Sequence, residues 1–320
     1  MLYLQIVAGL VLLVAGGDLF IRGAVGVARH FGLSALLIGL VLVGFGTSTP
    51  ELVTSLIAAM NGAPAIAIGN IAGSNIANIL LILGLAAVIA PLATDPAAMR
   101  RDGVVVMAST LAFVVLAVIG EAGRIAGALL LLGLAAYILT TYRTEANKDT
   151  PSAEFHRAEA DAATAQPFTS RLPFLILLLV AGLAMTIGGA HYLVNGAVGI
   201  ARTMGISESV IGVTIVAVGT SLPELVTSVV AALKRQSDIA LGNVIGSHIY
   251  NILGILGVTA LVHPVAIPED IAQRDVWVML VATVVLLVFA VSGWRITRRE
   301  GAIMLSGYAA FTLYLVLGGA

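Results

Sequence analysis

Long apolar segments follow one another along almost the whole chain, and this succession limits the folds it can adopt. A helix needs about 20 apolar residues to cross a bilayer. Ten segments of the 320-residue chain fit, at residues 3–21, 33–60, 65–90, 103–120, 124–142, 172–194, 206–233, 238–262, 275–292 and 300–318. Only 10% of the residues are charged, against about 25% in a typical soluble domain. The sequence therefore predicts an all-α polytopic membrane protein with ten transmembrane helices.

One long polar stretch, residues 143–171, interrupts the apolar pattern. It predicts a linker between two five-helix halves, residues 1–142 and 172–320. Thirteen of the 16 Lys and Arg residues fall in the loops after the first, third, fifth, seventh and ninth spans. By the positive-inside rule, both termini are expected outside and the linker in the cytoplasm. The first segment lacks the features of a cleaved signal peptide and is expected to be the first span.

A duplicated motif links the two halves. The decapeptide GTSTPELVTS at residues 46–55 returns as GTSLPELVTS at residues 219–228, and 26 of 47 positions are identical between residues 39–85 and 212–258. Five spans separate the copies, so the second copy must cross the membrane in the opposite sense. Inverted repeats of this kind build secondary transporters, whose substrate sites lie at interrupted helices near the midplane.

The motif combines a helix breaker with oxygen-bearing side chains. Pro50 has no N–H and clashes with the carbonyl of Gly46, so the second helix is predicted to break between about residues 44 and 50. Freed carbonyls, the Thr47 and Ser48 hydroxyls and the Glu51 carboxylate then gather within one turn. The second copy supplies Ala217, Gly219, Thr220, Ser221, Pro223 and Glu224, and predicts the same break in the seventh helix. Oxygen ligands suit Na⁺, Ca²⁺ and Mg²⁺.

Glu51 and Glu224 are the acids that the sequence places well inside spans. Such a residue costs about 2.5–3.5 kcal/mol on insertion scales and indicates function. A protonated glutamate used only for packing is the alternative, which two equivalent positions disfavour. A second layer of oxygen-bearing side chains is expected from the third and eighth spans, where residues four apart share a helix face: Ser74 with Asn78, and Ser247 with Asn251.

Other polar residues in these spans are interpreted structurally. Asn70 and Asn243 are expected to bridge helices. His248, which occupies the position of Asn75 in the other copy, is expected to be a hydrogen-bonded packing residue. Asp18 and His191 also occupy equivalent positions, and both are expected near the ends of spans.

The paired motifs G-T-S-x-P-E-L and G-N-x-x-G-S-x-I-x-N-I-L, each occurring twice, resemble the α-repeats of the calcium/cation antiporter superfamily, and most closely those of prokaryotic sodium/calcium exchangers. The resemblance covers nearly the whole chain. It implies ten helices in which helices 2, 3, 7 and 8 form the ion-binding core. Helices 1 and 6 are implied to be long, tilted and able to slide across that core.

The resemblance also implies roles for single residues. Glu51 and Glu224 match the two glutamates that bind Ca²⁺. The other implied ligands are the backbone carbonyls of Thr47 and Thr220, the hydroxyls of Ser48 and Ser221, the Na⁺-site serines Ser74 and Ser247, the carbonyls of Gly44 and Ala217 at outer Na⁺ sites, and the middle pair Asn78 and Asn251.

We therefore expect an antiporter that exchanges Na⁺ for Ca²⁺ in the cell membrane, with these ions and the lipid bilayer as its partners. No cofactor, nucleic acid or protein partner is implied. Asn251 stands where the potassium-dependent branch has aspartate, which argues against K⁺ co-transport. Proton-coupled relatives carry G-N-x-x-E-H, whereas this chain has Ser74 and Ser247, although His248 keeps a Ca²⁺/H⁺ antiporter open.

Two other classes fit the sequence less well. A passive cation channel is disfavoured because the two-fold duplication lies within one chain, whereas channels usually build a central pore by oligomeric symmetry. An enzyme is disfavoured because the sequence offers no plausible nucleophile–base pair and, without cysteine, no thiolate metal site.

Overall fold

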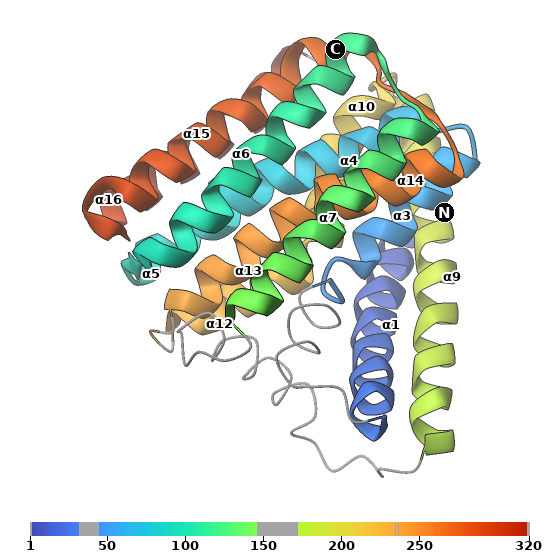
Figure 1. Ribbon diagram of the computed structural model, residues 1–320. Helices are drawn as coiled ribbons and strands as arrows, with labels where there is room; N and C mark the ends of the chain where they lie inside the picture. Colours follow the sequence, from blue (N-terminus) through green and yellow to red (C-terminus); the bar gives the residue numbers. More distant parts are fainter. Residues whose placement is uncertain (1, 32–44, 146–171, 234, 236, 319–320) are drawn as a thin grey trace.

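The computed structural model describes residues 2–31, 45–145, 172–233, 235 and 237–318, and these are almost entirely helical (Figure 1). The first half contains α1 (Leu2–His30), α3 (Thr49–Met60), α4 (Pro64–Ile76), the π-helix η2 (Ala77–Leu83), α5 (Gly84–Ile89), β1 (Leu92–Ala93), α6 (Pro96–Ile119), β2 (Glu121–Ala122) and α7 (Arg124–Glu145).

The second half begins with α9 (Leu172–Met204), α10 (Glu208–Ile211), the π-helix η3 (Gly212–Val216), α11 (Ala217–Thr220) and α12 (Leu222–Leu233). It continues with α13 (Ser237–Ile249), the π-helix η4 (Tyr250–Leu256), α14 (Gly257–Val262), β3 (Val265–Ala266), the π-helix η5 (Ile271–Asp275), α15 (Val276–Val291), the 3₁₀-helix η6 (Ser292–Trp294), β4 (Arg295–Ile296) and α16 (Arg298–Gly318).

Eight helical runs in the described residues are long and apolar enough to cross a membrane. A ninth is the pair Glu208–Thr220 and Leu222–Leu233, which is bent by 51° at its break. Of the predicted second span, 33–60, the described part is the turn before α3 and α3 itself; residues 33–44 lie outside the described part. α1 and α9, with 29 and 33 residues, extend well beyond the predicted spans 3–21 and 172–194.

α1 and α9 form an antiparallel pair that runs in a different direction from the other helices (Figure 1). Glycines recur every seven residues along the contact, at 9, 16 and 23 in α1 and at 182, 189 and 196 in α9. A Cβ atom at Gly16 would lie 2.7 Å from the backbone nitrogen of Thr186. The absence of side chains thus lets the two backbones touch, as small residues do in membrane helix pairs.

α1 is longer than the first predicted span. It continues nine residues beyond residue 21, to His30, so Asp18 lies in the interior of the helix. There the Asp18 carboxylate lies 2.8 Å from Nε of Arg22, one turn further along the helix. A helix can extend past the apolar segment that crosses a membrane, so the expected position of Asp18 near the end of the span stays a prediction.

The central helical runs α4–η2–α5 and α13–η4–α14 are the most buried of the candidate spans. α6, α7, α15 and α16 pack around them (Figure 1). Two short antiparallel ribbons tie loops of the two halves together, β1 with β4 through Leu92 and Ile296, and β2 with β3 through Ala122 and Val265. The central pair is therefore held by outer helices along its sides and by a ribbon at each end.

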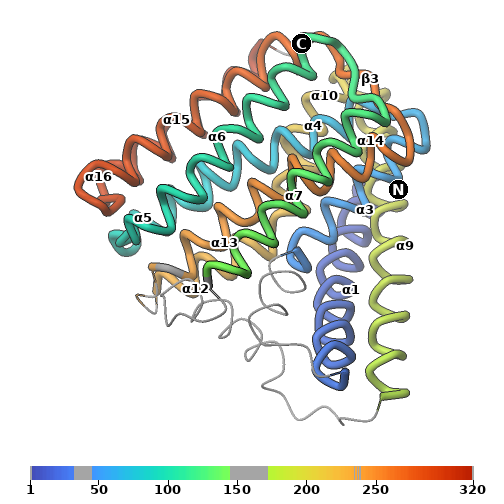
Figure 2. Tube along the Cα trace, in the orientation of Figure 1, coloured from blue at the N-terminus to red at the C-terminus, as the bar shows by residue number. Residues whose placement is uncertain are grey.

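The ends of the chain lie on the same side of the molecule. In the trace of Figure 2, the start of α1 and the end of α16 lie in the upper part of the view, whereas the end of α7 and the start of α9 lie lower. The orientation of the termini and the linker relative to a membrane stays a prediction.

The glycine contact between α1 and α9 makes a stability prediction with an adjacent control. A Cβ at Gly189 would lie 2.7 Å from the Leu13 nitrogen and 2.8 Å from the Gly9 oxygen, whereas a Cβ at Gly188 would meet nothing within 4 Å. We expect Gly189→Ala to destabilise the protein by ~1–3 kcal/mol through overpacking. Thermal unfolding in detergent should show a lower midpoint for Gly189→Ala than for the wild type, and an unchanged midpoint for Gly188→Ala. Equal midpoints for the two variants would contradict the close contact at Gly189.

Candidate functional site

Two equivalent helix interruptions form the centre of the site. Residues 45–48 make a turn before α3, and Ser221 separates α11 from α12. The backbone angles are nearly the same at both, with φ −89° and ψ 12° at Ser48 and φ −82° and ψ 12° at Ser221. Ser48 lies two residues before Pro50, and Ser221 lies two residues before Pro223. The predicted break is thus observed in the seventh span, and the described part of the second span has the matching turn.

The two glutamates follow these interruptions, in the first turns of α3 and α12, and both are buried. Each accepts a hydrogen bond from the serine of the other half. Ser48 Oγ donates to Glu224 Oε1 at 2.8 Å, and Ser221 Oγ donates to Glu51 Oε1 at 2.9 Å. The two copies of the motif therefore meet face to face, with each carboxylate fixed by the opposite copy.

The second oxygen of each carboxylate, Oε2 of Glu51 and of Glu224, has no hydrogen-bond partner although it is buried. The Thr47 hydroxyl nearby in sequence is also buried without a partner. Such atoms are costly in a low-dielectric interior unless something compensates them. A cation bound between the carboxylates would supply that compensation, so this donor set fits a metal ion.

An asparagine behind each glutamate holds the broken helix in place. Asn70 Nδ2 donates to the Glu51 carbonyl at 3.2 Å and to Ser55 Oγ at 2.9 Å. The equivalent Asn243 Nδ2 donates to the Glu224 carbonyl at 3.3 Å and to Ser228 Oγ at 3.0 Å. The predicted bridging role of both asparagines is confirmed by these contacts.

The Thr220 hydroxyl belongs to this supporting network. It lies 2.9 Å from the Asn70 Oδ1 atom, and 3.1 Å and 3.2 Å from the carbonyls of Val216 and Ala217. The Thr220 hydroxyl is therefore engaged by neighbouring protein groups in this conformation.

The serines of the second layer lie beside the interruptions. Ser247 Oγ is 3.4 Å from both Glu224 Oε1 and Ser48 Oγ. Ser74 Oγ donates to the Ala217 carbonyl at 3.4 Å, and that carbonyl also accepts the Ser221 N–H at 3.1 Å. Ala217 is therefore engaged by protein donors in this conformation. Its predicted counterpart, Gly44, lies outside the described residues.

Asn78 and Asn251 lie in the π-helices η2 and η4, which occupy equivalent positions in the two halves. π-turns are often found at functional sites, where they redirect side chains. Asn251 Nδ2 donates to Asn75 Oδ1 at 3.2 Å, and its own Oδ1 is buried without a partner. Both polar atoms of the Asn78 side chain are buried and unpartnered.

His248 forms a hydrogen bond with an outer helix. Its Nε2 lies 2.8 Å from the Thr110 hydroxyl of α6, and its Nδ1 is buried without a partner. The sequence predicted a hydrogen-bonded packing residue. Nε2 has such a hydrogen bond, whereas Nδ1 does not.

The chemistry of the site follows from its donors. Among the described residues, no three His, Asp or Glu side chains gather as a metal cluster. The assembled groups are two carboxylates, several hydroxyls and amide oxygens. Hard oxygen donors with only two formal charges favour Ca²⁺ or Na⁺ over transition metals, which prefer nitrogen or sulfur.

Two supporting residues were missed from the sequence. Ser55 and Ser228 accept the asparagine amides, yet they were not singled out as part of the site. Their signal was present, because the same residue type recurs at equivalent positions of the duplicated decapeptide. Identity between the copies identifies both ligands and the residues that orient them.

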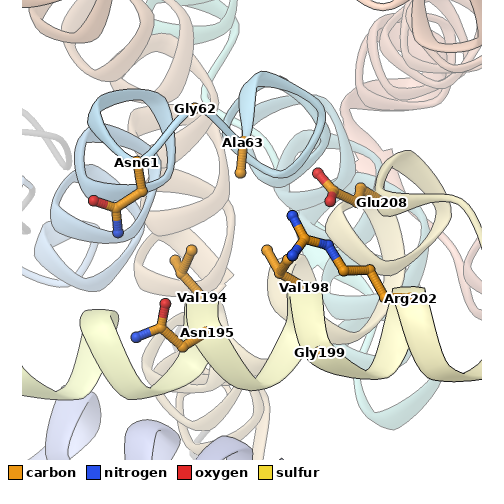
Figure 3. A pocket seen from close by; sticks show the side chains of 9 residues that line it. All are labelled: Asn61, Gly62, Ala63, Val194, Asn195, Val198, Gly199, Arg202 and Glu208. Carbon is orange, nitrogen blue, oxygen red and sulfur yellow. The ribbon is translucent and has the colours of Figure 1, made fainter.

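A separate cavity of about 290 Å³ lies between the α3–α4 turn, α9 and the start of α10 (Figure 3). Arg202 and Glu208 extend toward one another across it, and Asn61 and Asn195 line its other end. Glu51 is in the first turn of α3 and Asn61 follows the last residue of that helix, ten residues or about 15 Å further along its axis. The cavity is therefore distinct from the carboxylate site.

The chain is similar to known proteins over nearly its whole length. The family described as sodium/calcium exchanger protein matches residues 1–143 and 174–317. The sodium/calcium exchanger MaX1 of Methanosarcina acetivorans is 36% identical, with 98% of each chain covered, and the inner membrane protein YrbG of Escherichia coli is 34% identical, covering 98% of this chain and 95% of that protein. A solved structure of the sodium-calcium exchanger NCX_Mj is 35% identical, with a TM-score of 0.61 over 96% of this chain and 95% of that one.

The asparagine contacts make a prediction that does not depend on transport. Removing the Asn70 amide leaves the Glu51 carbonyl, Ser55 and Thr220 without its hydrogen bonds. We expect Asn70→Ala to destabilise the protein by ~1–3 kcal/mol, the usual cost of leaving buried polar groups unsatisfied. Thermal unfolding in detergent measures the effect. Asn195→Ala, at an exposed position of α9, is the control and should unfold like the wild type. Equal unfolding midpoints for Asn70→Ala and Asn195→Ala would show that the Asn70 contacts do not stabilise the helix interruption.

Proposed function

This chain belongs to the sodium/calcium exchanger family, and on that premise we propose that it is a secondary-active antiporter that exchanges Na⁺ for Ca²⁺. The observation that carries the proposal is the reciprocal bonding of Ser48 with Glu224 and of Ser221 with Glu51, which leaves one free oxygen on each buried carboxylate. Glu51 and Glu224 are the shared ligands, and the competing cations occupy the space between them.

Competition for one carboxylate pair explains coupling. Two buried anions repel one another and are poorly solvated, so a site without cations is costly to carry through an occluded state. Either Ca²⁺ or several Na⁺ neutralise the pair and lower that cost. The site therefore crosses the membrane only when loaded, and exchange becomes obligatory.

The remaining predicted ligands complete the proposed site. Thr47 and Thr220 contribute backbone carbonyls, and Ser48, Ser221, Ser74 and Ser247 contribute hydroxyls. Asn78 and Asn251 contribute their unpartnered side-chain oxygens. The carbonyls of Gly44 and Ala217 serve outer Na⁺ positions, and Ala217 must release at least one of its protein donors to do so.

The proposed architecture has ten transmembrane helices as two inverted five-helix repeats, residues 1–142 and 172–320, joined by the 143–171 linker. Equivalent interruptions, π-helices and asparagine contacts in the two halves support this duplication. The helix pair α1 and α9, which contacts α3 and η3, is the element proposed to move relative to the core. Its glycine-lined contact would let it move as one unit.

A Ca²⁺/H⁺ antiporter is the alternative function. Its sequence basis was His248, and the contact of that ring with Thr110 rather than with either glutamate disfavours a direct proton exchange at the carboxylates. Potassium coupling is disfavoured by the neutral Asn251.

Transport by the purified protein in liposomes tests the function. We expect Ca²⁺ uptake to require an outward Na⁺ gradient, and Glu51→Gln or Glu224→Gln to abolish it because one of the two charges that attract the cation is lost. Glu121→Gln, at an exposed position in the loop before α7, is the matched control and should transport like the wild type. Uptake that ignores Na⁺ and follows a pH gradient would establish the proton-coupled alternative instead. Flux that does not saturate would indicate a channel.

The proposed orientation places both termini outside and the linker in the cytoplasm of a cell-membrane protein. The chain contains no cysteine, so single cysteines can be introduced without background. We expect Glu121→Cys to react with a membrane-impermeant maleimide in intact cells and Arg143→Cys to react only after permeabilisation. Glu121, in the strand β2 before α7, and Arg143, in the last turn of α7, are both exposed, and they lie at opposite ends of this helix. The reverse labelling pattern would overturn the orientation and leave the exchange function untouched.

A further inference from the structure

His248 is a buried imidazole beside the proposed ion ligands for which the exchange mechanism above has no use. It lies on α13, next to Ser247, and it is fully buried. One ring nitrogen, Nε2, meets the Thr110 hydroxyl at 2.8 Å, and the other, Nδ1, has no partner. A buried ring nitrogen without a partner requires an explanation.

The contacts around Thr110 are compatible with a neutral ring that carries its hydrogen on Nε2. The Thr110 oxygen lies 2.8 Å from the Val106 carbonyl, and the equivalent Thr283 oxygen lies 2.8 Å from the Met279 carbonyl. A hydroxyl has one hydrogen. When Thr110 donates that hydrogen to the Val106 carbonyl, its oxygen accepts from His248 Nε2, and Nδ1 then presents a lone pair as a hydrogen-bond acceptor.

The equivalent position in the other half shows what such an acceptor does. Asn75 lies 173 residues before His248 and contacts the equivalent outer helix, since its Nδ2 lies 3.7 Å from Met279 Sδ on α15. At its other end, Asn75 Oδ1 accepts from Asn251 Nδ2 at 3.2 Å. The side chain thus spans from an outer helix to an asparagine on a π-helix, and it holds the amide nitrogen of that asparagine.

The two residues equivalent to Asn75 and Asn251 in the duplicated sequence are His248 and Asn78, so the equivalent contact would join His248 with Asn78. Asn78 is equivalent to Asn251, lies on η2, which packs against α13, and has both polar atoms buried and unpartnered. We propose that His248 is a positioning residue whose Nδ1 accepts a hydrogen bond from Asn78 Nδ2 and so turns Asn78 Oδ1 toward the transported cation. This inference rests on the proposed exchange function, because it assigns the orientation of one of its ligands.

The chemistry of the amide explains why an acceptor is needed. An asparagine offers an acceptor at Oδ1 and donors at Nδ2, and only Oδ1 can bind a cation. The lone pair of His248 Nδ1 attracts the Nδ2 hydrogens of Asn78 and so leaves Asn78 Oδ1 facing the cation site. The cation and the imidazole then favour the same rotation of the amide. An asparagine at position 248 would do the same through its own Oδ1, as Asn75 does.

Substitutions at position 248 separate this role from simple packing. In the liposome assay, we expect His248→Leu to raise the half-saturating cation concentration about tenfold, the change that corresponds to the loss of ~1.4 kcal/mol. Turnover at saturating cation should change less. His248→Asn restores an acceptor and should return the half-saturating concentration to within about twofold of the wild type. His263→Leu, at an exposed position after α14, is the control and should have no effect.

A spectroscopic measurement tests the hydrogen bond without transport. In ¹⁵N-histidine-labelled protein, the signal absent from His248→Asn identifies the ring. We expect a neutral ring with a bare Nδ1, whose ¹⁵N shift moves when Ca²⁺ or Na⁺ is added, because the Asn78 amide then donates to it.

The outcomes distinguish the two proposals. A wild type that exchanges no cations refutes the proposed function. A wild type that exchanges cations, together with an Nδ1 signal unchanged by Ca²⁺ and Na⁺, or with His248→Asn impaired as strongly as His248→Leu, overturns the role of His248 alone. If His248→Leu does not fold, the Nδ1 signal of the wild type and the behaviour of His248→Asn still decide the matter.

Discussion

Two carboxylates buried in the centre of a membrane protein are the constraint on which the rest of the structure depends. Each of Glu51 and Glu224 is held at one oxygen by a serine from the other half of the chain and lacks a partner at the second. An unpartnered carboxylate oxygen away from water is costly. The fold reduces that cost by bringing two interrupted helices together, so that a serine of each half bonds to the carboxylate of the other. The oxygens that remain unpartnered are the observation on which the proposed cation site rests.

The supporting residues follow the same two-fold plan with small departures. Asn70 and Asn243 fix the backbone behind each glutamate in nearly the same way. Asn75 and His248 occupy equivalent places but offer different chemistry, an amide oxygen in one case and an imidazole nitrogen in the other. The two halves of the candidate site are therefore alike at the carboxylates and at the asparagines behind them, and they differ at the position of Asn75 and His248.

The outer parts of the molecule have another physical basis. α1 and α9 contact one another through glycines rather than through interlocking side chains, so their backbones lie close together and the pair is distinct from the core in direction (Figure 1). The two short β-ribbons, in contrast, tie the loops of the core helices across the halves. The core is therefore fastened at both ends, and the α1–α9 pair is fastened mainly to itself.

The sequence by itself determined the class of protein, the duplication and the chemistry of the ligands. The bilayer dictates the length of the apolar segments, and proline interrupts a helix when it falls in the interior. An acid beside such a break can be recognised without coordinates. The sequence did not determine which serine holds which glutamate, the extension of α1 past Asp18, or the π-helices that carry Asn78 and Asn251. The first of these features depends on contacts between residues more than a hundred positions apart, such as Ser48 with Glu224. Local patterns specify what each segment can do, but only packing of the two halves decides which atoms meet and which stay unpartnered.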